Sequence, residues 1–146
     1  MKSNACRVIC LFFCAVALPA ELTPANLPER LDWFQDQGFG MFIHWSMDGQ
    51  IGAVISHSMA GASDDYLKRY IEVLPRTFYP EKFNPGAWAR LAKVAGMKYV
   101  MFTTKHHSGF CMFHTATTNF SVMNTPFKRD IVAEVAKAFR DEGIAV

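Results

Sequence analysis

The sequence has few cysteines and no disulfide framework. Three of its four cysteines, Cys6, Cys10 and Cys14, lie within the first 20 residues, which leaves Cys111 without a partner in the rest of the chain. The fold therefore depends on a hydrophobic core, and we expect Cys111 to be a buried apolar residue of that core. With 146 residues, of which 51% are apolar and 19% charged, the chain has the composition of a globular domain.

The chain also has little excess of positive or negative charge. The net charge is +2, and residues 1–20 hold two basic and no acidic side chains, so the remainder carries 13 of each sign. A surface that binds nucleic acid needs clustered Lys and Arg, and the sequence has no such cluster. We therefore expect no nucleic-acid partner.

The first 20 residues are typical of an export signal. Lys2 and Arg7 form a basic start, and the apolar stretch at 8–17 is shorter than the ~20 residues of a membrane span. A buried N-terminal helix is the alternative. We interpret residues 1–20 as a signal peptide and 21–30 as a linker, and we expect a secreted or periplasmic protein with no membrane span.

The rest of the chain alternates between apolar runs of strand length and amphipathic segments. Residues 39–45 are a nearly continuous apolar run, and residues 98–104 are rich in β-branched and aromatic side chains, which predicts two strands buried on both faces. Residues 144–146 have the composition of a third strand. Helices are predicted at 85–95 and 131–142. This alternation predicts an α/β fold whose parallel strands are joined by helical crossovers, and we expect the chain to be the front portion of a longer domain.

Residues with known positional preferences mark the ends of the two longer helices. Asn84 and Asp130 are predicted N-caps, and Gly96 is the predicted residue after the first of these helices. Leu91 is predicted to face the core. Residues 108–129 are interpreted as a polar loop.

Polar side chains come at the ends of both predicted strands. His44 and Trp45 end the first strand, and His106 and His107 follow the second. Because ligands of parallel α/β folds bind at the carboxyl ends of the strands, we expect these side chains to lie together. An imidazole can donate to one hydroxyl and accept from another, and a tryptophan can pack on the apolar face of a sugar ring. The sequence therefore predicts a site for a hydroxyl-rich ligand.

A zinc site is the chemical alternative. His44, His106 and His107 are possible zinc ligands, as in some barrel hydrolases, but adjacent residues on an extended backbone point apart, and no His-x-His pair is present. His57 and His114 lie in predicted loops, and we expect both to be exposed.

No carboxylate follows either predicted strand. Hydrolysis of a glycosidic bond usually takes two carboxyl groups that flank the scissile bond. Most acidic residues of this chain fall instead at predicted helix caps and on solvated helix faces. No catalytic acid can be assigned within these residues.

Four segments resemble motifs of the α-L-fucosidases of glycoside hydrolase family twenty-nine. They are residues 39–45 (FGMFIHW), 83–99 (F, W and LAK-AG-KY), 103–110 (TTKHHSGF) and 128–132 (KRDIV). The motifs occur in the family's order, and the resemblance covers roughly residues 31–146.

The resemblance implies a (β/α)₈-like barrel of the TIM type, of which residues 31–146 would be the N-terminal part, since a complete barrel takes ~250 residues. It implies retaining exo-hydrolysis of terminal α-linked L-fucose from a fucosylated oligosaccharide or glycoconjugate, with no cofactor and no metal. It maps the family's fucose-contacting histidines to His44, His106 and His107. The family's aspartate nucleophile and glutamate acid/base would fall beyond Val146.

Two departures from the family pattern concern the sugar pocket. Ser108 stands where the family has an aspartate, and the family's Glu-Trp pair falls near Ser56 and His57, which are therefore weak candidates for substrate binding. We expect the pocket floor or the specificity to differ. Two alternatives stay open: a carbohydrate-binding relative that lacks hydrolysis, and a metal-dependent barrel hydrolase.

Overall fold

The computed structural model describes residues 27–146, so the predicted signal peptide and most of the predicted linker lie outside the described residues. Along the chain come α1 (Pro28–Gln37), β1 (Gly40–Ile43), η1 (Met47–Ile51), α2 (Asp64–Glu72), η2 (Leu74–Thr77), α3 (Pro85–Val94), β2 (Tyr99–Phe102), η3 (Val122–Asn124) and α4 (Ile131–Asp141), where η denotes a 3₁₀ helix. The predicted alternation of strands and helices is confirmed. The helix α1 begins at Pro28, so residues 28–30 of the predicted linker are helical.

The two strands form a parallel pair in which Gly40 lies opposite Tyr99. Ala145 joins the other edge of β2, where the Val100 amide donates to the Ala145 carbonyl at 2.8 Å and the Ala145 amide donates to the Lys98 carbonyl at 3.0 Å. A third parallel segment therefore begins where the sequence predicted it. The α/β class is confirmed, and the barrel stays a prediction.

The helix ends form as the sequence predicted. The Asn84 carboxamide accepts from the Ala87 amide at 3.0 Å, and the Asp130 carboxylate accepts from the Ala133 amide at 2.8 Å. Each bond satisfies a backbone donor that has no partner within its own helix. Gly96 has φ 78°, a left-handed conformation that glycine adopts without strain.

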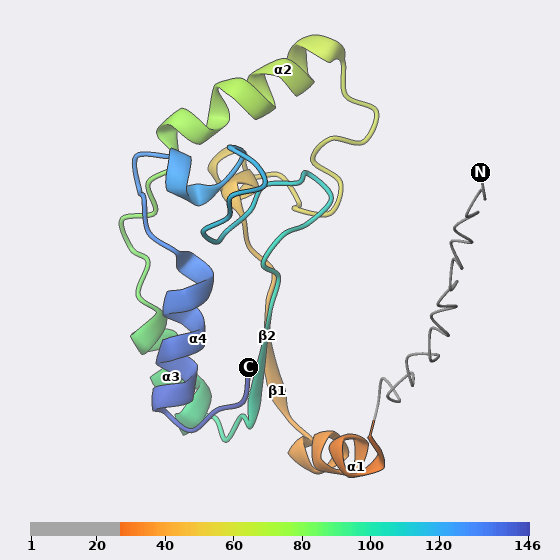
Figure 1. Cartoon of the computed structure of the whole chain (residues 1–146), viewed down its shortest axis with the longest axis vertical. Helices are drawn as coiled ribbons and strands as arrows, with labels where there is room; N and C mark the ends of the chain where they lie inside the picture. The colour runs from red at the N-terminus through yellow and green to blue at the C-terminus, as the bar shows by residue number, and fades with distance from the viewer. Residues whose placement is uncertain (1–26) are drawn as a thin grey trace, which may run out of the picture.

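The helices occupy distinct positions around the strands (Figure 1). The helices α3 and α4 pack against each other beside the strand pair, α2 lies beyond the carboxyl ends of the strands, and α1 lies near their amino ends. None of the helices within residues 27–146 is both long and apolar enough to cross a bilayer. Core side chains come from α4, from η1 and from the segment after β2 and include Phe139, Ile131, Val135, Met47, Phe110, Met112 and Val122.

The prediction that both strands are buried on both faces is wrong for this chain. Phe42 and Met101 are neighbours in the parallel register, and their side chains are 61% and 51% exposed. Val100 is buried, because it points to the face that α3 and α4 cover, whereas Met101 points to the opposite face. Leu91, predicted to face the core, is also exposed.

The segment at 108–129 is not the polar loop that the sequence predicted. Phe110, Met112 and Val122 are fully buried, and Cys111 is buried as expected. The Cys111 amide donates to the Phe120 carbonyl at 3.0 Å, so the segment folds back on itself. It therefore contributes much of the core beneath the strand ends.

Candidate functional site

The ring of His44 is held by hydroxyl groups on both of its nitrogens. His44 follows β1, and Thr103 follows β2, so the parallel register places them side by side. The Nδ1 atom of His44 lies 2.8 Å from Thr103 Oγ1, and Nε2 lies 3.1 Å from Ser56 Oγ. A neutral imidazole has one donor and one acceptor nitrogen, so one hydroxyl donates to the ring and the other accepts from it. A sugar hydroxyl that binds His44 must share or replace one of these partners.

The other two predicted histidines lie beside His44. The ring centroids of His44 and His106 are 4.7 Å apart and nearly perpendicular, and those of His106 and His107 are 4.2 Å apart. His44 and His107 are exposed, whereas His106 is half-buried. The structure therefore brings together the three imidazoles that the sequence singled out.

The environment of His106 favours its neutral form. Burial lowers the pKa of His106, and the nearby His107 and His44 rings lower it further, while the charge of Asp48 acts in the opposite direction. The Nδ1 atom of His106 is buried and has no hydrogen-bond partner within residues 27–146. A neutral ring can both accept and donate a hydrogen bond, as recognition of a polyol requires.

Trp45 is part of an aromatic cluster next to the histidines. Its ring stacks on Phe83 at 5.9 Å, meets Trp88 edge-on at 6.0 Å and lies 6.0 Å from Phe78. The side chain is half-buried. The neighbouring rings therefore cover part of the Trp45 indole. Packing of Trp45 against a sugar ring stays a prediction.

The two weaker candidates are placed differently. Ser56 contacts His44 and so belongs to the histidine group, whereas His57 is exposed, as expected. His114 is exposed too, and its backbone amide donates to the Asp130 carboxylate at 2.9 Å. In the described part of the chain, no group of three or more His, Cys, Asp or Glu side chains has an arrangement that could hold a metal ion.

Sequence reasoning missed Asp48 and Tyr70, which are connected through Ser58 to the segment that contacts His44. Asp48 is the second residue of η1 and only 1% exposed, and Tyr70, on α2, donates a hydrogen bond to its carboxylate. Burial and this hydrogen bond raise the pKa of Tyr70 to about 12. Tyr70 therefore stays protonated, and a donor, at neutral pH.

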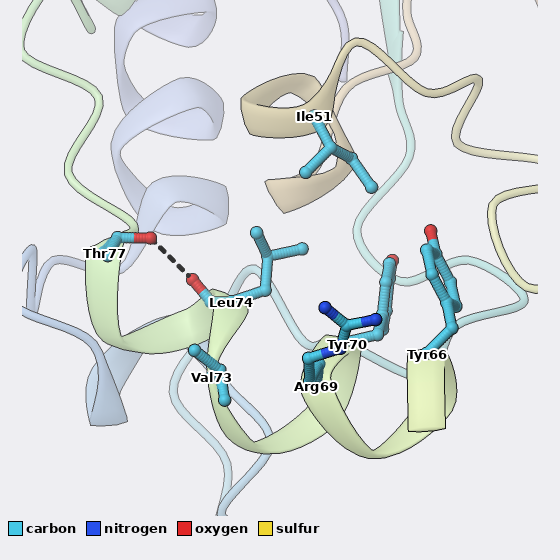
Figure 2. A pocket seen from close by; sticks show the side chains of 7 residues that line it. All are labelled: Ile51, Tyr66, Arg69, Tyr70, Val73, Leu74 and Thr77. Atoms are coloured by element: carbon cyan, nitrogen blue, oxygen red, sulfur yellow. Dashed lines mark hydrogen bonds between the residues drawn. The ribbon is translucent and has the colours of Figure 1, made fainter. Parts of the chain in front are cut away.

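Tyr70 also borders a pocket of about 270 Å³ between η1, α2 and η2 (Figure 2). Figure 2 shows side chains from these three elements around it, with the Thr77 hydroxyl donating to the Leu74 carbonyl at 3.1 Å. The lining is mainly apolar and consists of Ile51, Tyr66, Arg69, Tyr70, Val73, Leu74 and Thr77. Tyr70 thus belongs to both the pocket and the surroundings of the histidines.

Solved structures with a similar fold define the class of the protein. An α-L-fucosidase isoenzyme of Paenibacillus thiaminolyticus matches with a TM-score of 0.68 and 43% identity, over 80% of this chain and 27% of that one. A trapped covalent intermediate of a Bacteroides thetaiotaomicron α-L-fucosidase matches with a TM-score of 0.65 and 38% identity, over 82% of this chain and 29% of that one. The chain is part of an α/β glycosidase fold.

Sequence comparisons identify the family. The family model described as alpha-L-fucosidase matches residues 19–146, and the chain belongs to the α-L-fucosidase family. Tissue alpha-L-fucosidase of Bos taurus is 31% identical over 77% of this chain and 27% of its own length. A putative alpha-L-fucosidase of Caenorhabditis elegans is 32% identical over 74% of this chain and 26% of its own length. The chain thus spans about a quarter of the length of these relatives.

Proposed function

We propose that the chain serves in the hydrolysis of terminal α-linked L-fucose from glycans or glycoconjugates. The observation that carries this proposal is the meeting of three imidazoles at the carboxyl ends of two parallel strands, in a member of the α-L-fucosidase family. His44, His106 and His107 bind the sugar hydroxyls, because neutral imidazoles offer both donors and acceptors. Trp45 forms the adjoining apolar wall, and Ser56 and His57 contribute to specificity at the rim.

The chemistry proposed is retaining and uses two carboxyl groups. In such enzymes one carboxylate attacks the anomeric carbon to form a glycosyl-enzyme, and an acid/base group assists departure of the leaving group and then activates water. The covalent intermediate trapped for the Bacteroides relative supports this choice. Neither carboxyl group is assigned to residues 27–146, so the histidines position the sugar for acids carried by later strands.

The proposal therefore includes a longer (β/α)₈-like barrel whose first part is this chain. Two observations support a longer barrel. The chain covers only 27% of the Bos taurus relative and 27% of the Paenibacillus structure, and an apolar surface lies beside β2. Phe42 and Met101 are exposed on one face of the strand pair, and a cavity of about 300 Å³ lies between α1, β2, α4 and the Ala145 segment. Further barrel elements would cover these surfaces. We also propose that residues 1–20 direct export.

The test is hydrolysis of an aryl α-L-fucoside by the full-length gene product. We expect turnover with α-L-fucose as the first product seen by proton NMR, because two displacements retain the configuration. His44→Gln and His106→Gln should each lower kcat/KM by about 10-fold or more, since a carboxamide does not place its donor and acceptor where the two ring nitrogens hold theirs. His114→Gln is the matched control, because this exposed histidine lies outside the histidine group.

Three outcomes would contradict the proposal. Absence of turnover with retained binding of L-fucose would indicate a carbohydrate-binding relative. Release of β-L-fucose first would indicate inversion. Loss of activity on treatment with EDTA, restored by zinc, would indicate the metal-dependent alternative.

A further inference from the structure

Asp48 is a buried carboxylate that the proposed chemistry leaves unused. It is 1% exposed and lies four residues after His44, in the first turn of η1. One carboxylate oxygen accepts a hydrogen bond from Tyr70, and the other, Oδ2, is buried and has no partner among the described residues. No salt bridge within residues 27–146 involves Asp48. A buried carboxyl group with an unpartnered oxygen is costly, so a packing role alone gives no reason for its presence.

On one side, Asp48 connects through Tyr70 to the segment that contacts His44. The Ser58 hydroxyl donates to the Tyr70 hydroxyl at 3.3 Å. Two residues earlier, Ser56 makes its 3.1 Å contact with His44 Nε2. Residues 56–58 are therefore held at both ends, by His44 and by Tyr70.

On the other side, Asp48 acts on His106. Burial and the neighbouring His107 and His44 lower the pKa of His106, while Asp48 acts in the opposite direction and is the weakest of these influences. These three side chains and the backbone of Ile55 are the groups that act on His106. The Ser108 side chain, directly after the histidine pair, interacts with the Tyr70 hydroxyl and lowers its pKa. Both polar segments of the site thus converge on Asp48 and Tyr70.

We propose that Asp48 is a positioning residue of the sugar site, and that its buried carboxylate, with Tyr70, holds residues 56–58, and through Ser56 the His44 ring, in the arrangement that binds substrate hydroxyls. This inference rests on the proposed function, because it concerns the same histidines. Asp48 touches neither sugar nor reacting atoms and acts through its neighbours. Its removal should therefore weaken substrate binding more than it slows the chemical step.

The test compares three variants of the full-length protein. Asp48→Asn keeps the shape and an acceptor for Tyr70 but removes the charge. Tyr70→Phe keeps the charge but breaks the connection to Ser58. Asp65→Asn, which changes an exposed acid paired with Arg69 on α2, is the matched control. KM and kcat are measured on an aryl α-L-fucoside, and the pKa of His106 is measured by proton NMR of the imidazoles.

We expect Asp48→Asn to raise KM about 10-fold with kcat changed no more than about 3-fold, and to lower the pKa of His106, since a charge-assisted interaction is lost. Tyr70→Phe should raise KM by a smaller factor and leave the pKa of His106 lowered as in the wild type. Asp65→Asn should change neither quantity.

An unchanged KM and an unchanged pKa of His106 in Asp48→Asn would overturn the inference. If Asp48→Asn fails to fold, Tyr70→Phe decides: a raised KM supports the connection through Ser58, and a wild-type KM refutes it. Absence of fucoside hydrolysis by the wild type would refute the proposed function instead, and the pKa of His106 in the two variants would still decide whether Asp48 acts on this ring.

Discussion

Replacing Trp45 distinguishes packing from sugar binding at the edge of the histidine group. The indole has three aromatic neighbours, Phe83, Trp88 and Phe78, with ring centroids at 5.9 to 6.0 Å. Aromatic pairs contribute about 0.5–1.5 kcal/mol each beyond area burial, and truncation of a core Trp to Ala costs about 3–5 kcal/mol. Because Trp45 is only half-buried, we expect Trp45→Ala to lower the free energy of unfolding by about 3 kcal/mol.

The assay is urea unfolding followed by far-UV circular dichroism. With a slope of about 1–3 kcal/mol per molar urea, a loss of about 3 kcal/mol lowers the midpoint by about 1–3 M. Trp45→Phe retains a ring in the cluster and should lose about 1 kcal/mol. Trp33→Ala is the matched control, because Trp33 is 41% exposed on α1 and the Arg30 guanidinium lies 4.8 Å from its ring centroid.

The reasoning would be refuted if Trp45→Ala unfolded at the wild-type urea midpoint. A normal midpoint combined with a raised KM for an aryl α-L-fucoside would show that the indole serves the sugar and that the aromatic cluster does not depend on it. A lowered midpoint with the same KM would show the reverse.

Three further changes test the fold and the electrostatics of the site. Gly40→Ala should lower the free energy of unfolding, measured with urea, by about 1–3 kcal/mol, because the added Cβ would lie 2.4 Å from the Tyr99 ring. If Gly40→Ala lowered this free energy equally in the wild type and in Tyr99→Ala, the Tyr99 ring would not be the cause. Asp130→Ala should cost about 1–2 kcal/mol, since it removes the N-cap of α4 and the acceptor of the His114 amide; an unchanged midpoint would show that neither bond stabilises the fold. The pKa of His106 is lowered from the usual histidine value of 6.5, so between pH 6.5 and the folded-state pKa the folded protein binds fewer protons than the unfolded chain. The free energy of unfolding is therefore highest above pH 6.5 and falls as the pH drops through the folded-state pKa. His106→Gln should therefore flatten the fall in Tm on acidification, and an equally steep fall would contradict the assigned pKa direction.

The positions of the histidines could be predicted from sequence because strand ends are local features. An apolar run of strand length that stops at His44, and a second that leads to His106, are visible without any knowledge of long-range contacts. Parallel pairing then places both ends at one edge, and the structure does so. The caps Asn84 and Asp130 were predictable for the same reason, since each bonds an amide three residues away.

The role of Asp48 could not be predicted in this way, because its burial depends on residues far along the chain. Its neighbour Tyr70 is 22 residues later, on a helix whose position over the strand ends no local pattern specifies. The exposure of Phe42 and Met101 was missed for a related reason. An apolar run indicates that a strand is suited to burial, whereas the covering layer depends on which other elements pack there.

The strand register determines whether the three imidazoles can act as one site. Because Ile43 lies opposite Phe102, His44 comes next to Thr103, and their 2.8 Å contact fixes the ring. The Met112 amide then donates to the Thr104 carbonyl at 3.0 Å, which turns the chain back and brings His106 to within 4.7 Å of His44. A slip of one residue would send the His44 side chain to the other face of the strand pair. The close packing of Gly40 on Tyr99, at the opposite end of the strands, therefore contributes to the arrangement of the three imidazoles although it lies outside the histidine group.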